Sequence, residues 1–317
     1  MTFKYFSDEE LGSKELSSEE IPVTVWNSIV ATYNQFVENC ALAGNFPYYC
    51  PDDQGICGCD KTQLEDKLKG EIPDLPVPVK KIVCPPKTSN SFWNDEKEKK
   101  EEEDDLPNKY AILDFLQFLH KNIKDPFERR YHEYYGHHHY TFSDNGLYQA
   151  EFRKSINTLF SRNGIVFFID EDGQIKRSIP KSIAKIITDI RFNTGDERLN
   201  ELLETAYSKF ILPRPDSRID SLEKIWDAFE RLKTYFEENK KSSANQLINV
   251  VSEKNSLFSE HTTKEFEELT KIGNKFQIRH FERDKIKLES NLHIDYLFYR
   301  MSCLIHLCVE SLKHKQL

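Results

Sequence analysis

The sequence predicts a mostly α-helical protein, with an α+β N-terminal module that contains one small β-hairpin and a C-terminal antiparallel helical bundle. Three observations lead to this fold class. Apolar residues recur every three or four positions through much of the chain, which is the period of an amphipathic helix. A clear strand pattern occurs around Asp172-Gly173. From residue 196 onward, helical patterns follow one another, so we expect two domains, residues 1–195 and 196–317.

The first predicted helix covers residues 21–43 and ends near Gly44. One face of it is apolar and consists of Trp26, Ile29, Val30, Tyr33, Phe36 and Val37. Residues 46–60 are rich in Pro, Gly and Asp and are expected to form a structured loop. Five prolines in residues 71–87 indicate an extended connector. The unbroken run of charges at 95–105 is typical of an exposed loop or a frayed helix.

Two more helices are expected in the N-terminal module, over residues 111–123 and 147–162. The second should end at Asn163-Gly164, which are common residues after a helix. The hairpin follows, with strands at 165–169 and 174–179 joined by a turn at Asp172-Gly173.

The C-terminal bundle is predicted from four apolar helix faces. They are Leu199, Leu202, Leu203, Ala206 and Phe210; Leu222, Ile225, Trp226, Phe229, Leu232 and Phe236; Phe266, Leu269 and Ile272; and Leu297, Met301, Leu304, Ile305, Cys308 and Leu312. Neither a P-loop nor a dinucleotide-binding fingerprint occurs in the sequence. Nucleotide-binding folds that rely on those motifs are therefore not expected.

Composition favours a protein of the cytoplasm. The N-terminal residues contain no secretory signal pattern, and the apolar runs are far shorter than the ~20 residues that span a bilayer. Seven cysteines, without the spacing of a disulfide framework, fit a reducing compartment. The net charge of −9 excludes a basic coat for nucleic acid over the whole surface. Residues 213–317 nevertheless carry 18 basic and 17 acidic side chains, so a local anion site is possible there.

The most basic stretch, residues 271–287, contains six Lys or Arg and two acidic residues, with Arg279 directly beside His280. A guanidinium can bind a phosphate, and an imidazole can transfer a proton near neutral pH. If residues 276–286 are helical, His280 lies over Asp284. This pair suits RNA cleavage, with His280 as base and Arg279 against the charge on phosphorus. The alternative is a solvated basic helix face whose histidine packs or caps.

Four segments carry a resemblance to a known family: WDAFERLKT (226–234), KKS (240–242), IGNKFQIRHFE (272–282) and DYLFYRM (295–301). They resemble the C-terminal domains of bacterial abortive-infection proteins, which are related to the HEPN superfamily of helical domains. The resemblance covers residues 213–312. RNGIVFFIDEDGQIKR (162–177) also resembles, more weakly, the N-terminal module often fused to such domains. The resemblance implies a homodimer, formed through the C-terminal bundle, that acts on RNA as a metal-independent endoribonuclease in defence against phage.

HEPN nucleases typically carry an Arg, four to six intervening residues and then a His. Counting from Arg279, those positions hold Asp284, Lys285 and Ile286, so His280 would have to substitute. The expected supporting residues are Glu282, or Glu230 with Arg231; the expected phosphate-binding residues are Asn274, Lys275, Arg283, Arg231 and Lys233. The alternative is a non-catalytic HEPN-like domain that senses or scaffolds, binding RNA, a nucleotide or a protein partner.

Cys50, Cys57 and Cys59 form a candidate structural zinc site, although gaps of six residues and one residue match no standard zinc knuckle. Cys40, Cys84 or a distant His could complete the ligand set. Zinc would brace a loop that has little apolar content. The alternative is a set of reduced, partly buried thiols.

A histidine cluster lies in residues 131–140: His132, His137, His138 and His139. It could bind a transition metal or meet a phosphate beside aromatic rings, and Arg129 and Arg130 lie just upstream. Neighbouring residues of a strand point to opposite faces, so we expect at most two of these imidazoles to serve one ion. The alternative is an aromatic segment packed under the helices. A metal-dependent phosphodiesterase is less favoured, because no convincing Asp/His ligand set accompanies the cluster.

Overall fold

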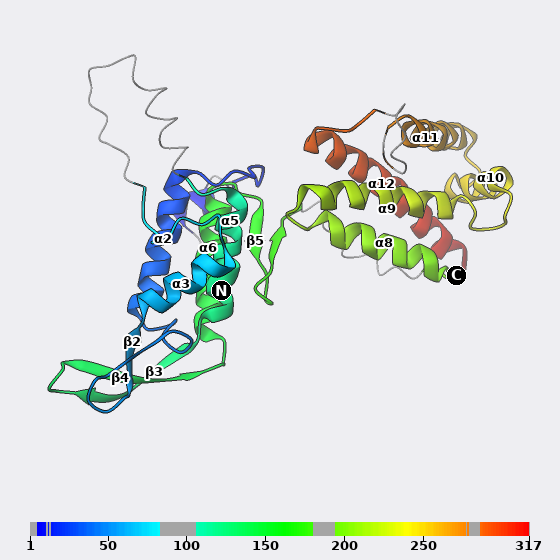
Figure 1. Cartoon of the computed structure of the whole chain (residues 1–317). Coiled ribbons are helices and arrows are strands. Elements are labelled where there is room, and N and C mark those ends of the chain that lie inside the picture. The colour runs from blue at the N-terminus through cyan, green and yellow to red at the C-terminus, as the bar shows by residue number, and fades with distance from the viewer. Residues whose placement is uncertain are drawn as a thin grey trace, which may run out of the picture. The chain divides into compact units, whose positions relative to one another are not determined.

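The computed structural model describes residues 5–10, 12, 14–82, 106–179, 194–276, 278 and 286–316. The chain divides into two compact units, Met1–Ser178 and Ile179–Leu317 (Figure 1). Sequence patterns alone place the domain boundary at 195/196. The charged run at 95–105 lies outside the described residues.

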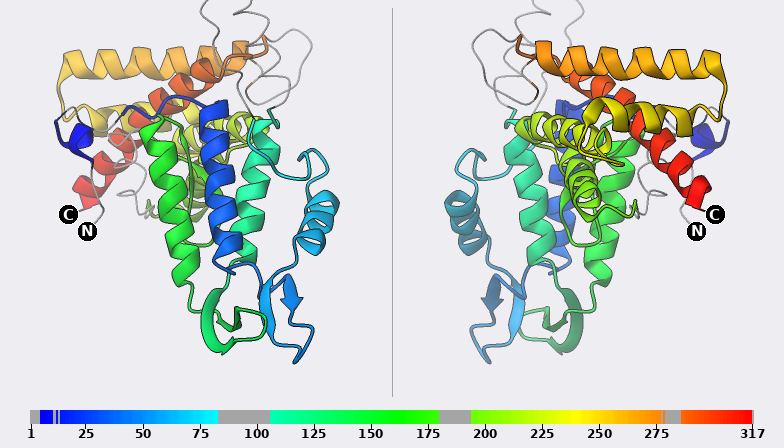
Figure 2. Two further views of the ribbon diagram at one scale, coloured as in Figure 1. Left: turned by 90° about the vertical axis from the view of Figure 1, so that its left-hand side faces the viewer. Right: turned by 90° about the vertical axis from the view of Figure 1, so that its right-hand side faces the viewer.

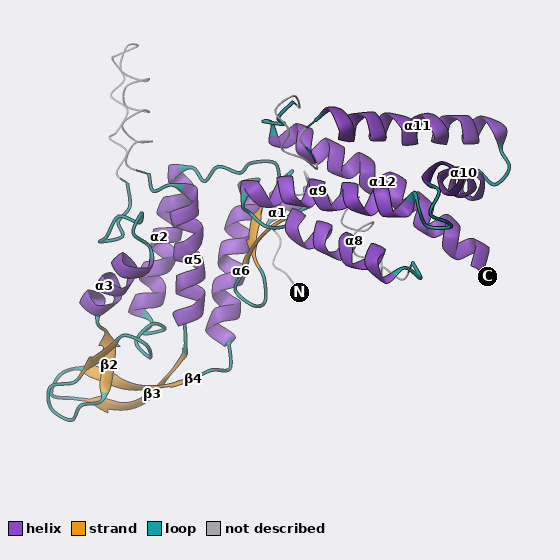
Figure 3. Cartoon of the chain, turned by 45° about the vertical axis from the view of Figure 1, so that its right-hand side comes forward, coloured by secondary structure: helices purple, strands orange, loops and turns teal. Residues whose placement is uncertain are grey.

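Three helices form the body of the N-terminal unit: α2 (Val23–Glu38), α5 (Lys109–Asn122) and α6 (Leu147–Arg162). They run side by side, as Figures 2 and 3 show. The predicted apolar faces meet between them, where the Phe115 ring lies 5.4 Å from Tyr33 and Phe36 lies 5.4 Å from Phe152, centroid to centroid. Because the apolar residues recur at helical spacing, α2 and α6 each bury one stripe and leave the other face solvated, whereas α5 buries eight of its 14 residues.

Shorter segments cover this body. Helices α1 (Phe6–Glu10) and α3 (Lys61–Glu71) flank it, and α3 is capped by Asp60, whose side chain accepts hydrogen bonds from the amides of Thr62 and Gln63. The predicted connector runs along α2 in its described part. The Trp26 indole donates to the Lys80 carbonyl, and the Asn27 side chain pairs with the backbone of Ile82. Polar atoms of the helix thus hold a segment that has no regular hydrogen bonds of its own.

The described strands form two-stranded antiparallel sheets. The predicted hairpin is confirmed as β5 (Phe167–Ile169) and β6 (Ile175–Arg177). Two more were not predicted: β1 (Pro47–Tyr49) with β2 (Ile56–Cys59), inside the expected loop, and β3 (Asp125–His132) with β4 (His137–Ser143). β2 lies beside β4 at one end of the helices (Figure 3).

The described C-terminal unit is all helical, as predicted. Its helices are α8 (Glu197–Phe210), α9 (Pro215–Leu232), α10 (Lys240–Val251), α11 (Ser256–Lys275) and α12 (Asn291–Gln316). Helices α8 and α9 form an antiparallel hairpin, and α12 packs on α9 and α10. Phe210 stacks on Phe298 with ring centroids 3.9 Å apart. None of the helices in the described ranges is long and apolar enough to cross a lipid bilayer.

Candidate metal centre

Four side chains of the N-terminal unit converge at the end where the hairpins meet: Cys50, His132, His137 and His139. One ligand atom from each lies within 4.8 Å of every other. Cys50 follows β1 directly, His132 ends β3, and His137 and His139 lie on β4. Cys50, His132 and His139 are buried and His137 is half-buried, so the group is largely screened from solvent.

The strand geometry explains how three imidazoles meet. His137 and His139 are two residues apart on β4 and therefore share one face of the strand. In the hairpin register His132 pairs with His137, which brings a third ring to the same place. The sequence predicted that at most two of these histidines could bind one ion. That prediction considered only residues of a single strand and left out His132, which is paired with His137 across the hairpin. His138 lies near Glu128 instead, with Nδ1 3.7 Å from a carboxylate oxygen.

Two of the ligand separations match those around a tetrahedral zinc ion. Zn–N bonds of ~2.0–2.1 Å and a Zn–S bond of ~2.3 Å put neighbouring ligand atoms of a tetrahedron roughly 3.3–3.6 Å apart. Cys50 Sγ lies 3.4 Å from His132 Nδ1, and His137 Nε2 lies 3.3 Å from His139 Nε2. One thiolate and three neutral imidazoles form a complete four-ligand set, with no position left open for a substrate.

Ionisation in the group also suits metal binding, which requires neutral imidazoles. Burial, and then the neighbouring His139 and His132, lower the pKa of His137. His137 and His139 bring their Nε2 atoms to 3.3 Å from one another, so two inward-facing lone pairs repel each other at this point. A metal ion removes that conflict by accepting both lone pairs.

Two aspartates of the β1–β2 loop surround the ligands. Asp52 Oδ2 lies 3.2 Å from His132 Nε2, the ring nitrogen opposite the one that faces Cys50. A carboxylate in this position orients a metal-binding imidazole and raises its basicity. Asp53 Oδ1 lies 3.4 Å from His139 Nε2 and accepts a hydrogen bond from the Gly55 amide, which is the main cause of the lowered pKa of Asp53.

Gly55 allows the loop to approach the ligands closely. A Cβ atom at this position would lie 2.7 Å from His139 Nδ1, which is closer than real Cβ contacts. The loop therefore reaches the imidazoles only because residue 55 has no side chain.

Of the predicted Cys50, Cys57 and Cys59 set, the structure places Cys50 in the group and the other two outside it. Cys57 Sγ donates to the Tyr48 carbonyl over 3.6 Å, and Cys59 packs against the core, where burial raises its pKa to about 12. Cys84 lies outside the described residues. Gly136 was the sequence feature that could have revealed the ligand set, because it has a φ of 65° in the turn of the β3–β4 hairpin. A hairpin turn at this glycine pairs His132 with His137.

A family model described as AbiJ N-terminal domain 4 matches residues 4–190. The chain belongs to this AbiJ family. Comparison with curated proteins and with solved structures found no match. Membership in an abortive-infection family implies a role in phage defence. The predicted relation to abortive-infection proteins is thus confirmed, through the N-terminal module that resembled them less strongly, whereas a HEPN-like C-terminal domain stays a prediction.

Of the RNA-site residues predicted for this AbiJ chain, Arg279, His280, Glu282 and Arg283 lie outside the described residues. Helix α11 ends at Lys275, and Phe276, in extended conformation, forms a parallel bridge with Ile286. The assumption that the chain is helical from residue 276 is therefore wrong at its first residue. Asn274 and Lys275 are exposed in the last turn of α11.

The predicted residues at the end of α9 are described, and they take part in ion pairs. Glu230 lies between two ammonium groups, 2.6 Å from Lys233 Nζ and 2.7 Å from Lys240 Nζ. Burial opposes its charge, but the two lysines outweigh burial and lower the pKa of Glu230. Arg231 Nε donates to Asp196 over 2.7 Å. The structure thus brings Glu230 and Lys233 together.

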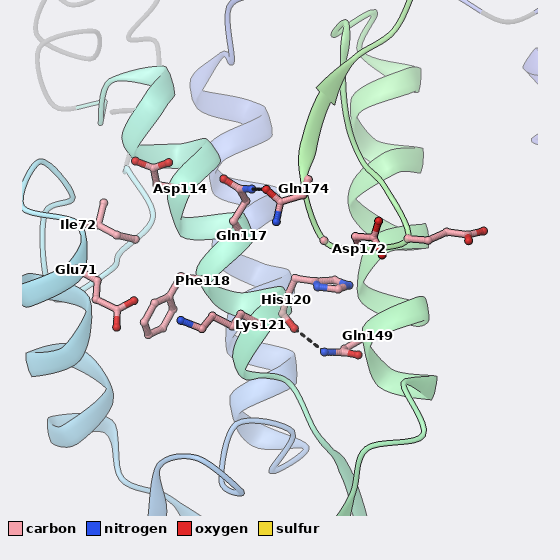
Figure 4. Close-up of a pocket in the computed structure, with 12 residues that line it drawn as sticks. Glu71, Ile72, Asp114, Gln117, Phe118, His120, Lys121, Gln149, Asp172 and Gln174 are labelled. Carbon is pink, nitrogen blue, oxygen red and sulfur yellow. Dashed lines mark hydrogen bonds between the residues drawn. The ribbon is translucent and has the colours of Figure 1, made fainter. Parts of the chain in front are cut away.

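A pocket of the N-terminal unit, with a volume of about 590 Å³, lies between α3, α5 and the β5–β6 turn (Figure 4). His120 lies in its wall, with Arg153 Nη1 donating to His120 Nε2 over 3.0 Å. Since a guanidinium only donates, this imidazole is neutral and carries its proton on Nδ1. Burial, and then Arg153, lower its pKa. Gly173, with a φ of 78°, packs against the ring, and a Cβ there would lie 2.2 Å from Nδ1.

Proposed function

We propose that this AbiJ-family protein defends bacteria against phage by cleaving RNA, with a zinc-braced N-terminal unit joined to a helical unit that performs the cleavage. The observation that supports the zinc assignment is the convergence of Cys50, His132, His137 and His139, whose ligand atoms all lie within 4.8 Å of one another. The match over residues 4–190 supports the role in defence.

The zinc ion has a structural role in this proposal. Four protein ligands close the coordination sphere, which is typical of structural rather than catalytic sites. The ion joins the β1–β2 loop to the β3–β4 hairpin. Two-stranded hairpins are marginally stable alone, and these carry exposed aromatic side chains such as Tyr48, Tyr131 and Tyr134. The metal bonds replace the apolar contacts that this end of the unit lacks.

Metal analysis of the purified full chain tests the assignment. We expect about one zinc ion per chain, and its loss in Cys50→Ser and in His137→Ala. Cys57→Ser is the matched control, because Cys57 lies in the same loop and outside the ligand group. Equal zinc content in Cys50→Ser and Cys57→Ser would refute the proposed ligand set.

In the cleavage step, His280 takes the proton of a ribose 2′-OH, and the resulting oxyanion attacks the adjacent phosphorus. The P–O5′ bond breaks and the leaving 5′-oxygen takes a proton from water, which leaves a 2′,3′-cyclic phosphate and a 5′-hydroxyl; His280 then returns its proton to the solvent. Arg279 balances the charge that develops on the phosphoryl oxygens. Glu282, or Glu230 with Arg231, supports His280. The site is formed by two chains of a homodimer. No metal ion takes part, so cleavage and zinc binding are separate functions of the two units.

Total RNA incubated with the purified protein and EDTA should give discrete fragments with cyclic-phosphate ends. Arg279→Ala and His280→Ala should each abolish the fragments and leave the zinc content unchanged. Absence of fragments, with or without metal ions, would favour the second candidate, a non-catalytic module that holds RNA, a nucleotide or a protein. Fragments that disappear only on chelation would point to the histidine cluster instead.

A further inference from the structure

A groove with a volume of about 460 Å³ lies in the C-terminal unit between α10 and α11, beside the end of α9. Four lysines line it: Lys233, Lys240, Lys241 and Lys271. Ile248 and Phe266 contribute apolar surface. Among these lysines, only Lys233 was predicted as a phosphate ligand; Lys240 and Lys241 belong to α10, and Lys271 belongs to α11.

The charges of the groove do not cancel. Glu230 neutralises part of the set, since its two oxygens bind Lys233 and Lys240. Lys271 has a distant partner, Glu268, at 3.9 Å. Within the described ranges, no carboxylate pairs with the ammonium of Lys241. The four ammonium groups face three carboxylates, those of Glu230, Glu267 and Glu268, so the groove keeps a small net positive charge in a chain of net charge −9.

One of these charges is built into the fold. Lys233 is 8% exposed, donates to Thr270 Oγ1 over 3.2 Å and lies 4.7 Å from the centre of the Phe229 ring. These contacts fix its ammonium group at the wall of the groove. Lys240 is the first residue of α10, so the positive end of that helix lies at the same place. The side chains of Lys241 and Lys271 are exposed and can move toward a ligand.

We infer that this groove binds a nucleoside phosphate. Lysines are common phosphate ligands, and here four of them line one groove. The apolar surface of Ile248 and Phe266 suits the face of a base, and the volume falls within the ~300–1,000 Å³ of small-ligand sites. The nucleoside phosphate comes either from a free nucleotide or from one position of an RNA strand. The inference deepens the proposed function, and it rests on that function for the RNA source.

Binding of a labelled 12-nucleotide 2′-O-methyl RNA to the full chain, followed by fluorescence anisotropy, tests the inference. The methyl group blocks attack by the 2′-oxygen, so the measurement reads binding without cleavage. Lys241→Glu and Lys271→Glu should each weaken binding by about tenfold and reduce the slope of log K against log salt by ~1. Both side chains are exposed, so folding should not change. Arg198→Glu, the same charge change on exposed α8, should bind as the wild type does.

Competitors distinguish the two sources. If ATP displaces the RNA, and both lysine variants lose affinity for ATP as they do for RNA, the ligand is a free nucleotide. If ATP does not displace the RNA, the ligand is one position of an RNA strand. Equal displacement by a glutamate decapeptide, or unchanged binding in both lysine variants, overturns the inference. Binding retained without any cleavage of ordinary RNA would refute the proposed function alone, whereas cleavage with lysine-independent binding would refute the groove alone.

Discussion

Gly273 of α11 lies directly against the indole of Trp226 on α9. A Cβ atom on Gly273 would lie 2.3 Å from Trp226 Nε1, far inside contact distance. The same indole nitrogen donates to the carbonyl of Leu269, one turn earlier in α11, over 3.3 Å. The two helices therefore dock at a point where one has no side chain, which is a structural reason for the glycine of the IGN segment.

Replacing Gly273 with alanine should destabilise the C-terminal unit. Overpacking a buried contact costs about 1–3 kcal/mol, whereas alanine in a helix interior gains only about 0.5–1 kcal/mol over glycine. We expect a net loss of roughly 1–2 kcal/mol in urea unfolding. Gly70→Ala is the matched control, because a Cβ at this helical glycine has no atom within 4 Å and should stabilise slightly. Equal effects of the two substitutions would contradict the close packing.

Removing zinc should lower the melting temperature of the wild-type protein. A ligand that binds only the folded state stabilises it by RT ln(1 + [L]/Kd), about 4 kcal/mol at a thousandfold excess over Kd. Thermal unfolding with and without a chelator measures the change. The chelator should have no further effect on Cys50→Ser and a full effect on Cys57→Ser. A wild-type melting temperature that does not respond to chelation would show that the ion does not brace the hairpins.

Asp52→Asn should weaken zinc binding and leave the four ligands in place. Its carboxylate lies 3.2 Å from the outer nitrogen of His132, and loss of such a partner typically costs 10–100-fold in metal affinity. Competition with a zinc-binding dye measures the affinity. Asp66→Asn is a suitable control, since Asp66 is an exposed residue of α3 that pairs with Lys69. Unchanged affinity in Asp52→Asn would mean that the contact does not orient His132.

His120 should make the N-terminal unit less stable in mild acid. Burial and Arg153 lower its pKa in the folded chain, so between that pKa and the ordinary value of ~6.5 the unfolded chain binds more protons. Stability then rises with pH through this window and is lost as the pH falls below ~6.5 toward the lowered pKa of the folded chain. Chemical unfolding across this range, in wild type and His120→Gln, measures the difference.

Other groups of the unit also change their charge with pH. The quantity to compare is therefore the difference in unfolding free energy between wild type and His120→Gln. His120→Gln should flatten the part of the pH profile that comes from this one ring. The charge of Asp170 raises the pKa of His120 and acts against the shift. A difference that does not change with pH would exclude the buried neutral histidine as its cause.

The fold class depended mostly on information that is local in the chain. Apolar residues at helical spacing were enough to predict α2, α5, α6 and α12, because each helix needs only one stripe to bury. Asp172-Gly173 likewise marked its hairpin, since Gly173 adopts a positive φ that few other residues tolerate. Turn chemistry and periodicity are properties of neighbouring residues, so a sequence can show them directly.

The metal centre depended on contacts that are distant in the chain. The sequence alone marked Cys50 as a ligand and His132, His137 and His139 as a cluster, but as two separate candidates. Cys50 and His132 are 82 residues apart, and only the packing of β2 beside β4 brings their hairpins together. Local spacing carries no information about such a meeting, because it is the buried core of helices that sets where each hairpin leaves the unit. Tertiary structure therefore decided which thiol and which imidazoles share one ion.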